Sequence, residues 1–515
     1  MASVGQQTVD PEREVDTGVL DLYRSVWRAA RDVIVRRRLV VLFEVGLIAV
    51  WLVLRTEVTV ESRPYVAWTL VAAAVALISP TSGLVLLVAT APFFEPPTLL
   101  RVVGIRPNGQ VLGMRHLLVA SLGVAVALRI AAGGWRRLPR SPALGLAVVI
   151  GLLTAISAIR TLVEFDPQFG PRAAQSWIAT IGGAMIVLLV ATWVGRTGTI
   201  RPLVAATAGC ALASLLSLVE LARPGTISQG PLDWIGQWKD FGPRVTGIIA
   251  APNAVATMLI VPAIVSTAAI GNLRGWRRLA AAIAALPTLA ATLLTLSRSA
   301  VGGFFVAIVL FVGRHRRRTA WALFAVGIVV AALALPLFIQ LRAGIVGITA
   351  NESPIEWILG ADEARFTAWA ASIRMFLDSP IVGHGFLSYR FLGPAFGDPR
   401  LGSPHNEVLR LFAEEGIVGG IVIIAFIVAL IRELRRPGDW LATALVAGAI
   451  SYWFAAMFNN PLLFIQVSAI AFTFFGFGLA RSTAPAAPAV GDVVAPAAPP
   501  DEPRPTEVIR PPPSD

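Results

Sequence analysis

Charged residues and cysteine are scarce in this sequence. Only 14% of its 515 residues are charged, 56% are hydrophobic, and the mean hydropathy is +0.72. This composition excludes an ordinary soluble domain and a charge-rich disordered chain. Cys210 is the one cysteine and lies in an apolar run, so neither a disulfide nor a thiolate metal site can form within the chain.

Lysine is also nearly absent, because Lys239 is the only one and arginine supplies the remaining basic groups. A formal net charge of +12 would indicate nucleic-acid binding in a soluble protein. Here the arginines cluster in short links between apolar runs, so membrane topology explains the charge and no nucleic-acid partner is expected. The N-terminal residues lack the pattern of a cleaved signal peptide, and we expect the first apolar run to remain as an anchor.

Long apolar runs recur along most of the chain. Their lengths approach the roughly 20 residues that a helix needs to cross a hydrocarbon core of about 30 Å, and lipid requires the backbone polar groups to be bonded within each segment. The sequence therefore predicts an all-α fold, a polytopic membrane helical bundle of about 12–14 transmembrane helices surrounded by membrane lipids. The candidate spans lie near residues 39–54, 65–79, 84–97, 116–133, 143–160, 176–194, 202–220, 252–270, 279–296, 300–313, 319–340, 416–434, 441–457 and 461–480.

Arginine-rich links alternate along this series, as expected of the cytoplasmic side. If the short second and third spans do not cross, twelve spans remain and the alternation is unchanged. We therefore predict a multi-pass protein of the inner or plasma membrane with both termini in the cytoplasm. One link, with Arg101, Arg106 and Arg115, departs from the rule. The arginine-rich links that obey the rule contain Arg36–Arg38, Arg136 with Arg137 and Arg140, Arg196 with Arg201, Arg274 with Arg277 and Arg278, Arg314 with Arg316–Arg318, and Arg432 with Arg435 and Arg436.

Changes in composition divide the chain into five parts. A helical face shared by Phe366, Trp369, Ile373 and Phe376 predicts a helix lying on the membrane surface within the long polar segment. The parts are a cytoplasmic N-terminus with an interfacial helix (1–38), the first part of the membrane domain (39–340), an extracytoplasmic loop containing short helices (341–415), the last membrane helices (416–480), and a disordered, Pro-rich cytoplasmic tail (481–515).

The segment SPHNEVLRLFAEEGIVGG, residues 403–420, carries a histidine just before an apolar run. Ser403 and Pro404 resemble an N-cap followed by a first-turn proline, which would put His405 and Asn406 in the first helical turn. The positive end of the helix dipole disfavours imidazolium, so His405 is expected to be neutral near pH 7 and able to accept a proton. The alternative is a capping or structural histidine at the membrane surface.

Three arginines, Arg244, Arg298 and Arg365, fall on the same outer side as this histidine. Arg298 follows Ser297 in a very short link between two spans, where a guanidinium is costly unless it meets an anion or a carboxylate. Arginine can bind phosphate through two parallel hydrogen bonds. Each of the three could instead be an interfacial side chain that reaches toward water.

Taken in order, the motifs on this side resemble those of the O-antigen ligase and polymerase family over about residues 200–460. The His-Asn segment with its trailing glutamate and glycines is the most specific of them. The motifs are Arg-x-x-Gly-x(4)-Pro-Asn at 244–253, Ser-Arg at 297–298, Arg-x(3)-Trp at 365–369, Pro-x-x-Gly-x-Gly at 380–385, and His-Asn-x-x-Leu-x(4)-Glu-x-Gly-x-x-Gly at 405–419.

The resemblance implies a membrane glycosyltransferase in cell-surface polysaccharide biosynthesis. It would take a glycan from an undecaprenyl diphosphate carrier and join it to an acceptor hydroxyl on the extracytoplasmic face, the acceptor being a glycan, a lipid or a cell-wall molecule. The family's histidine and arginines fall on His405, the catalytic general base, and on Arg298 and Arg244. Arg365 is grouped with these arginines as diphosphate-binding.

Supporting roles are expected for Asn253, Asn406 and Glu414, with Glu414 pairing locally with Arg410. His384, between two glycines, is the second candidate base and is more typical of a structural turn residue. The outer loops contain no HExxH, Asp-x-Asp or paired-histidine motif, so neither a metal ion nor another cofactor is expected.

Other functions remain open from the sequence. A polymerase that joins carrier-linked repeat units of a capsule or exopolysaccharide would differ from a ligase only in its acceptor. A lipid-linked glycan transporter would have similar spans, but transporters usually carry charges near the bilayer midplane, and Glu44 is the exception to a pattern of charges at the span ends. A scaffold would not need the outer histidine and arginines.

Overall fold

The computed structural model describes residues 39–50, 63–93, 114–132, 138–165, 176–229, 251–313, 354–399 and 402–482, together with positions 134, 245, 318 and 325. Within these ranges the chain forms helices and no strand. Six of these helices are long and apolar enough to cross a membrane, and seven shorter apolar helices accompany them. The prediction of an all-α polytopic membrane helical bundle is confirmed.

Every predicted span overlaps a helix except the one at 319–340, which, apart from position 325, lies outside the described residues. The predicted interfacial helix before residue 39 and almost all of the Pro-rich tail lie outside them as well. The tail prediction begins two residues early, since the last helix continues to Ser482. After Leu39–Val50 come α2 (Arg63–Ile78), α3 (Pro80–Thr90), α5 (Met114–Ala131), α6 (Pro142–Glu164), α8 (Ile181–Gly195), α9 (Arg201–Ala222), α10 (Pro252–Asn272), α11 (Gly275–Leu294), α12 (Arg298–Gly313), α14 (Pro354–Asp378), α15 (Tyr389–Leu392), η4 (Gly393–Phe396), α16 (Glu407–Leu434), α17 (Trp440–Ala456), η5 (Pro461–Leu463) and α18 (Ile465–Ser482).

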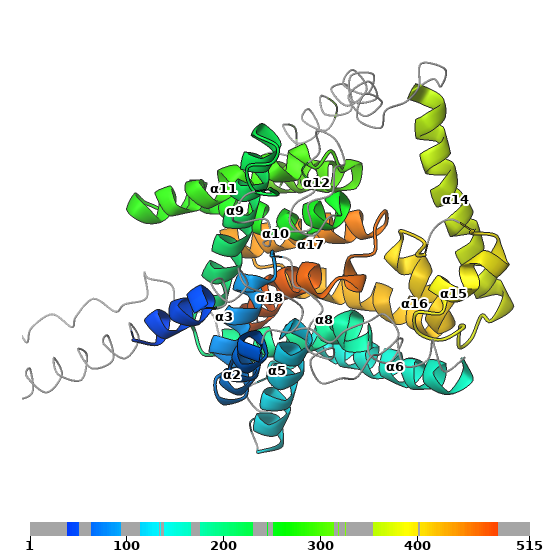
Figure 1. The fold of residues 1–515 in the computed structure, drawn as a ribbon, viewed down its shortest axis with the longest axis horizontal. Helices are drawn as coiled ribbons and strands as arrows, with labels where there is room; N and C mark the ends of the chain where they lie inside the picture. Colours follow the sequence, from blue (N-terminus) through cyan, green and yellow to red (C-terminus); the bar gives the residue numbers. More distant parts are fainter. Residues whose placement is uncertain are drawn as a thin grey trace, which may run out of the picture.

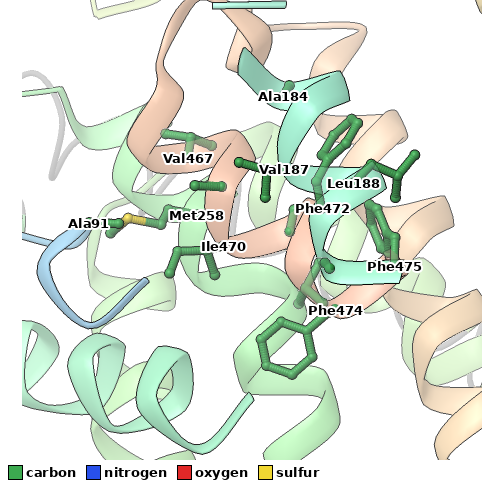
Figure 2. Packing of buried hydrophobic residues seen from close by; sticks show 14 of the residues in the cluster. Ala91, Ala184, Val187, Leu188, Met258, Val467, Ile470, Phe472, Phe474 and Phe475 are labelled. Atoms are coloured by element: carbon green, nitrogen blue, oxygen red, sulfur yellow. The ribbon is translucent and has the colours of Figure 1, made fainter. Parts of the chain in front are cut away.

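The core of the bundle lies where α18 packs against α8, with α10 and α17 beside it (Figure 1). Phe472 and Phe475 of α18 lie next to Leu188 of α8 (Figure 2). The two backbones approach closely because Gly476 has no side chain: a methyl group there would lie 2.6 Å from the Cβ of Ala191. Small residues commonly allow such close helix packing in membranes.

Helix α14 crosses the end of the bundle instead of running alongside α16 and α6 (Figure 1). The apolar face predicted for this helix is divided between two environments. Trp369 and Phe376 pack on the bundle, with ring centroids 6.2 Å from Phe458 and 5.4 Å from Phe412, whereas Phe366 and Ile373 are exposed. A crosswise helix with an exposed apolar edge suits a membrane surface, and that placement stays a prediction.

The predicted start of the helix after His405 is wrong. Asn406, not Ser403, is the N-cap of α16, and its Oδ1 accepts hydrogen bonds from the N–H groups of Val408 and Leu409, both at 3.1 Å. His405 precedes the helix in a left-handed conformation, with φ 49°. The Asn406 side chain thereby satisfies two of the free N–H groups that every helix start leaves without an intrahelical partner.

Helix α16 is interrupted at Gly416, which has φ 67° and ψ −162°. The part after the break contains the apolar run that was predicted to begin at residue 416. The part before it is helical as well, as the helix predicted to begin beside His405 required, and it lies within the stretch that the sequence assigned to the extracytoplasmic loop. The break therefore separates a short segment that begins beside His405 from the long apolar one.

Candidate functional site

A tight turn positions Arg298 at the start of α12. Helix α11 ends at Leu294, and Leu296 follows with a left-handed φ of 52°. The N–H of Ser297 donates to Oγ1 of Thr295 at 3.2 Å, and α12 begins at the next residue. The short link predicted from the sequence thus holds the arginine at the end of the bundle.

The chain next to Arg244 approaches the same turn. Arg244 itself lies outside the described residues. Its neighbour Val245 is buried, and its N–H donates to the carbonyl of Leu294 at 3.0 Å, directly before the turn that leads to Arg298. The order of the motifs along the sequence gave no indication of this contact.

Arg298 and Arg365 line one cavity of about 290 Å³. Arg298 comes from α12 and Arg365 from α14, so the fold brings together two arginines that are far apart in the sequence. The rest of the lining is mainly aromatic: Phe366 and Trp369 of α14, Phe454 of α17 and Phe458 after it, with Ser299 and Gly302 of α12. A cavity with two guanidinium groups and apolar walls suits an anionic group attached to an apolar or ring-shaped one.

His405 is half-buried and lies near Arg365, one of the two arginines of the cavity. Burial lowers the pKa of His405 because it disfavours imidazolium, and the nearby Arg365 guanidinium lowers it further, whereas Asp398 acts in the opposite direction. Its Nδ1 is buried and has no hydrogen-bond partner within the part of the chain that the structure describes. The imidazole is therefore neutral near pH 7, as predicted, and burial and the Arg365 guanidinium are the causes that the fold adds.

Asp398 is a site residue that the sequence analysis missed. It is only 1% exposed, and its Oδ2 accepts a hydrogen bond from the Tyr389 hydroxyl at 2.7 Å. Burial and the neighbouring Asp398 carboxylate raise the pKa of the Tyr389 phenol, so that it stays protonated and can donate. A lone aspartate in a Gly-Asp-Pro turn carries no sequence signal that would have identified it.

The interpretation that Glu414 pairs with Arg410 is confirmed. Arg410 Nη1 donates to Glu414 Oε2 at 2.7 Å, and Arg410 also binds the carboxylate of Glu407, with Nε 3.0 Å from Oε1. The three side chains are at most 1% exposed. Glu407 was missed, although its spacing of three and seven residues from Arg410 and Glu414 places all of them on one helix face.

The two glycine motifs hold each other through their backbones. The N–H of Gly385 donates to the carbonyl of Glu414 at 2.8 Å, and the N–H of Ile417 donates to the carbonyl of Pro380, also at 2.8 Å. His384, the second candidate base, lies in this joint with Nε2 2.9 Å from the carbonyl oxygen of Met375. Its contacts are those of a structural residue at the end of α14.

Asn253 is the second residue of α10 and lies half-buried. Its carbonyl accepts a hydrogen bond from Oγ1 of Thr257 at 2.8 Å. Of the predicted site residues, the structure thus brings Arg298 and Arg365 to one cavity and His405 near Arg365, and it uses Asn406 as a helix cap and Glu414 in a buried ion pair. Among the described residues, no group of three or more His, Cys, Asp or Glu side chains could hold a metal ion.

Residues 279–424 match a family model described as O-Antigen ligase. The matched stretch contains Arg298, Arg365, His405 and both glycine motifs. No curated protein matches the chain. The resemblance that the motifs predicted is confirmed, and it supports a glycosyl-transferring role in polysaccharide biosynthesis.

Proposed function

From the match of residues 279–424 to the O-antigen ligase family model, we propose that this membrane protein transfers a glycan from an undecaprenyl diphosphate carrier to an acceptor hydroxyl on the extracytoplasmic face. The observation that carries the proposal is the cavity that Arg298, Arg365 and aromatic side chains line, with a neutral His405 near Arg365. The domain division predicted from the sequence, with residues 341–415 on the outer side, is part of the same proposal.

The arginines account for the departure of the lipid diphosphate. Breaking the bond between the sugar and the diphosphate leaves about two to three negative charges on the leaving group, which fixed cationic donors can stabilise. Arg298 and Arg365 supply planar donor groups from two sides of the cavity. Arg244 would be a third donor, since its neighbour Val245 is hydrogen-bonded beside the Arg298 turn. No metal ion is needed for this step.

His405 provides the base. Its neutral imidazole accepts the proton of the acceptor hydroxyl as that oxygen attacks the anomeric carbon, and the electron pair of the breaking C–O bond goes to the diphosphate. General-base catalysis of this kind contributes a factor of about 100 to 10,000 in rate. The Asp398 carboxylate stabilises the imidazolium that forms, and the Asn406 cap fixes the start of α16 directly after the histidine.

The contacts of Glu44 argue against a transporter. This acidic group, which the sequence places within a span, forms an ion pair with Arg201, with Oε1 2.9 Å from Nη1. It is thus paired next to a helix start and not presented as an unpaired midplane charge. A polymerase acting on a carrier-linked acceptor uses the same donor cavity and differs from a ligase only in the second substrate.

The proposal is tested with purified protein in nanodiscs, an undecaprenyl diphosphate-linked glycan and candidate acceptors. Release of undecaprenyl diphosphate and the mass of the product are measured for the wild type, Arg298→Gln and His405→Ala. Both variants should lose transfer, whereas Arg390→Gln, at an exposed arginine on α15, should retain it. Transfer at the wild-type rate by both site variants would refute the proposed chemistry, and a product still attached to a carrier would identify a polymerase.

A further inference from the structure

Three consecutive residues after α17, Phe458, Asn459 and Asn460, make contacts with three different parts of the fold. Phe458 lines the arginine cavity and packs against Trp369 of α14. The Asn459 side chain donates to Oγ1 of Thr257 on α10 at 3.5 Å, and that of Asn460 donates to Oε2 of Glu407 on α16, also at 3.5 Å.

The two asparagine contacts connect to residues of the candidate site. Thr257 is hydrogen-bonded to the carbonyl of Asn253. Glu407 is the first residue of α16, two positions after His405. The two asparagines are also joined to each other, because the N–H of Asn460 donates to Oδ1 of Asn459 at 2.9 Å.

Asn460 contacts the buried charged cluster formed by Glu407, Arg410 and Glu414 through Glu407. Arg410 binds Oε1 of Glu407, and Asn460 approaches the other carboxylate oxygen, Oε2. The Glu407 side chain is thereby oriented from both sides, and it is 0% exposed. Its fixed position anchors the beginning of α16 and hence the backbone that carries Asn406 and His405.

Burying an asparagine inside an apolar bundle is costly unless its polar atoms are used. Asn460 is 1% exposed, and its Oδ1 has no hydrogen-bond partner within the described ranges. An apolar residue of similar size would fill the same space without this cost. The amide is thus better explained by its orientation toward the Glu407 carboxylate than by packing.

We propose that Asn460 is a positioning residue, which acts through Glu407 to set the place of His405 relative to the cavity of Arg298 and Arg365. The inference rests on the proposed function, because position matters here for proton transfer. A displacement of the base by about 1 Å can cost about 100-fold in rate. The amide contacts of Asn459 with Thr257 and of Asn460 with Glu407 are both long, at 3.5 Å, so the loss of either one is expected to change the transfer rate moderately.

The first test measures the surroundings of His405 without using activity. Folded wild type and Asn460→Ala are treated with diethyl pyrocarbonate, and the modification rate of each histidine is followed by peptide mass spectrometry. The His405 rate should rise about tenfold, equivalent to about 1.4 kcal/mol, because the α16 start is less firmly held. His384, hydrogen-bonded to Met375, is the internal reference and should not change.

The matched control is Asn272→Ala, whose side chain binds the Ala268 carbonyl at the far end of α10. It should leave the His405 rate at the wild-type value. Asn460→Ser is the second variant if Asn460→Ala does not fold, and it should give a smaller rise in the same direction. An unchanged His405 rate in a folded Asn460 variant would overturn the inference, whatever reaction the protein catalyses.

The second test is a double-mutant cycle on transfer. Asn460→Ala should lower kcat about tenfold with unchanged donor binding, and it should cause no further loss in the His405→Ala background, because its effect passes through that histidine. An equal additional loss in that background would show that Asn460 acts elsewhere and would overturn the inference. Activity retained by His405→Ala together with a raised His405 modification rate would refute the proposed base and leave the positioning role standing.

Discussion

Gly383 and Gly416 lie back to back where the connection after α14 meets the break in α16. A methyl group built on Gly383 would lie 2.5 Å from the nitrogen of Gly416, and one built on Gly416 would lie 2.8 Å from the nitrogen of Gly383. Both residues have positive φ, 63° and 67°. Neither position can accept a side chain without moving the other, so the Pro-x-x-Gly-x-Gly and Glu-x-Gly motifs are the two halves of one joint.

The joint predicts that Gly416→Ala is strongly destabilising. The backbone conformation alone costs an alanine about 1–3 kcal/mol, and the added methyl would also displace the Ile381 backbone. We expect a lower midpoint of thermal aggregation in detergent and loss of transfer. Gly145→Ala in α6 has no atom within 4 Å of its new methyl and should be neutral or slightly stabilising. Equal midpoints for the two variants would contradict the role of the joint.

The surroundings of His405 predict the acid limb of the pH profile. The neutral histidine is the active form, so kcat/KM should rise with pH to a plateau, with a midpoint below the ordinary histidine pKa of 6.5. Arg365→Gln removes a charge that lowers this pKa and should move the limb to higher pH. Asp398→Asn removes a charge that raises it and should move the limb to lower pH. If the acid limbs of the wild type, Arg365→Gln and Asp398→Asn have the same midpoint, His405 is not the titrating base.

An arginine-only mechanism predicts that transfer continues in excess EDTA. Activity that is lost in EDTA and restored by magnesium or manganese would disprove the mechanism.

Arg298→Lys should bind the donor more weakly than the wild type, because a point charge replaces a planar fork that can form two parallel bonds to phosphate. Donor affinity is measured by titration in nanodiscs with and without chelator.

The alternation of arginine-rich links predicts that η4 faces the outside and the turn after α16 faces the cytoplasm. Cysteines are introduced singly at the exposed Ala395 and Pro437 in a Cys210→Ser background. An impermeant maleimide should label Ala395→Cys in intact cells and Pro437→Cys only after permeabilisation. The opposite pattern would invert the topology and place His405 in the cytoplasm.

The sequence by itself determined the fold class and the approximate position of the long apolar helices among the described residues. This was possible because a helix in lipid needs a long apolar run, and such runs can be read directly from the order of residues. It also determined the pairing of Arg410 with Glu414, since residues four apart face each other on any helix. The motif order was sufficient to predict the match to the O-antigen ligase family model, because the residues of each motif are close together in the sequence.

Only the tertiary structure decided which residues of those motifs meet and which cavity they line. The cavity joins Arg298 to Arg365 across two helices, and Asn460 reaches Glu407 over 53 residues of sequence. Local rules gave the wrong helix start, since the cap depends on which side chain meets the free N–H groups of α16. The neutrality of His405 likewise comes from burial and a neighbouring helix, and contacts between distant segments depend on packing that no local pattern in the chain encodes.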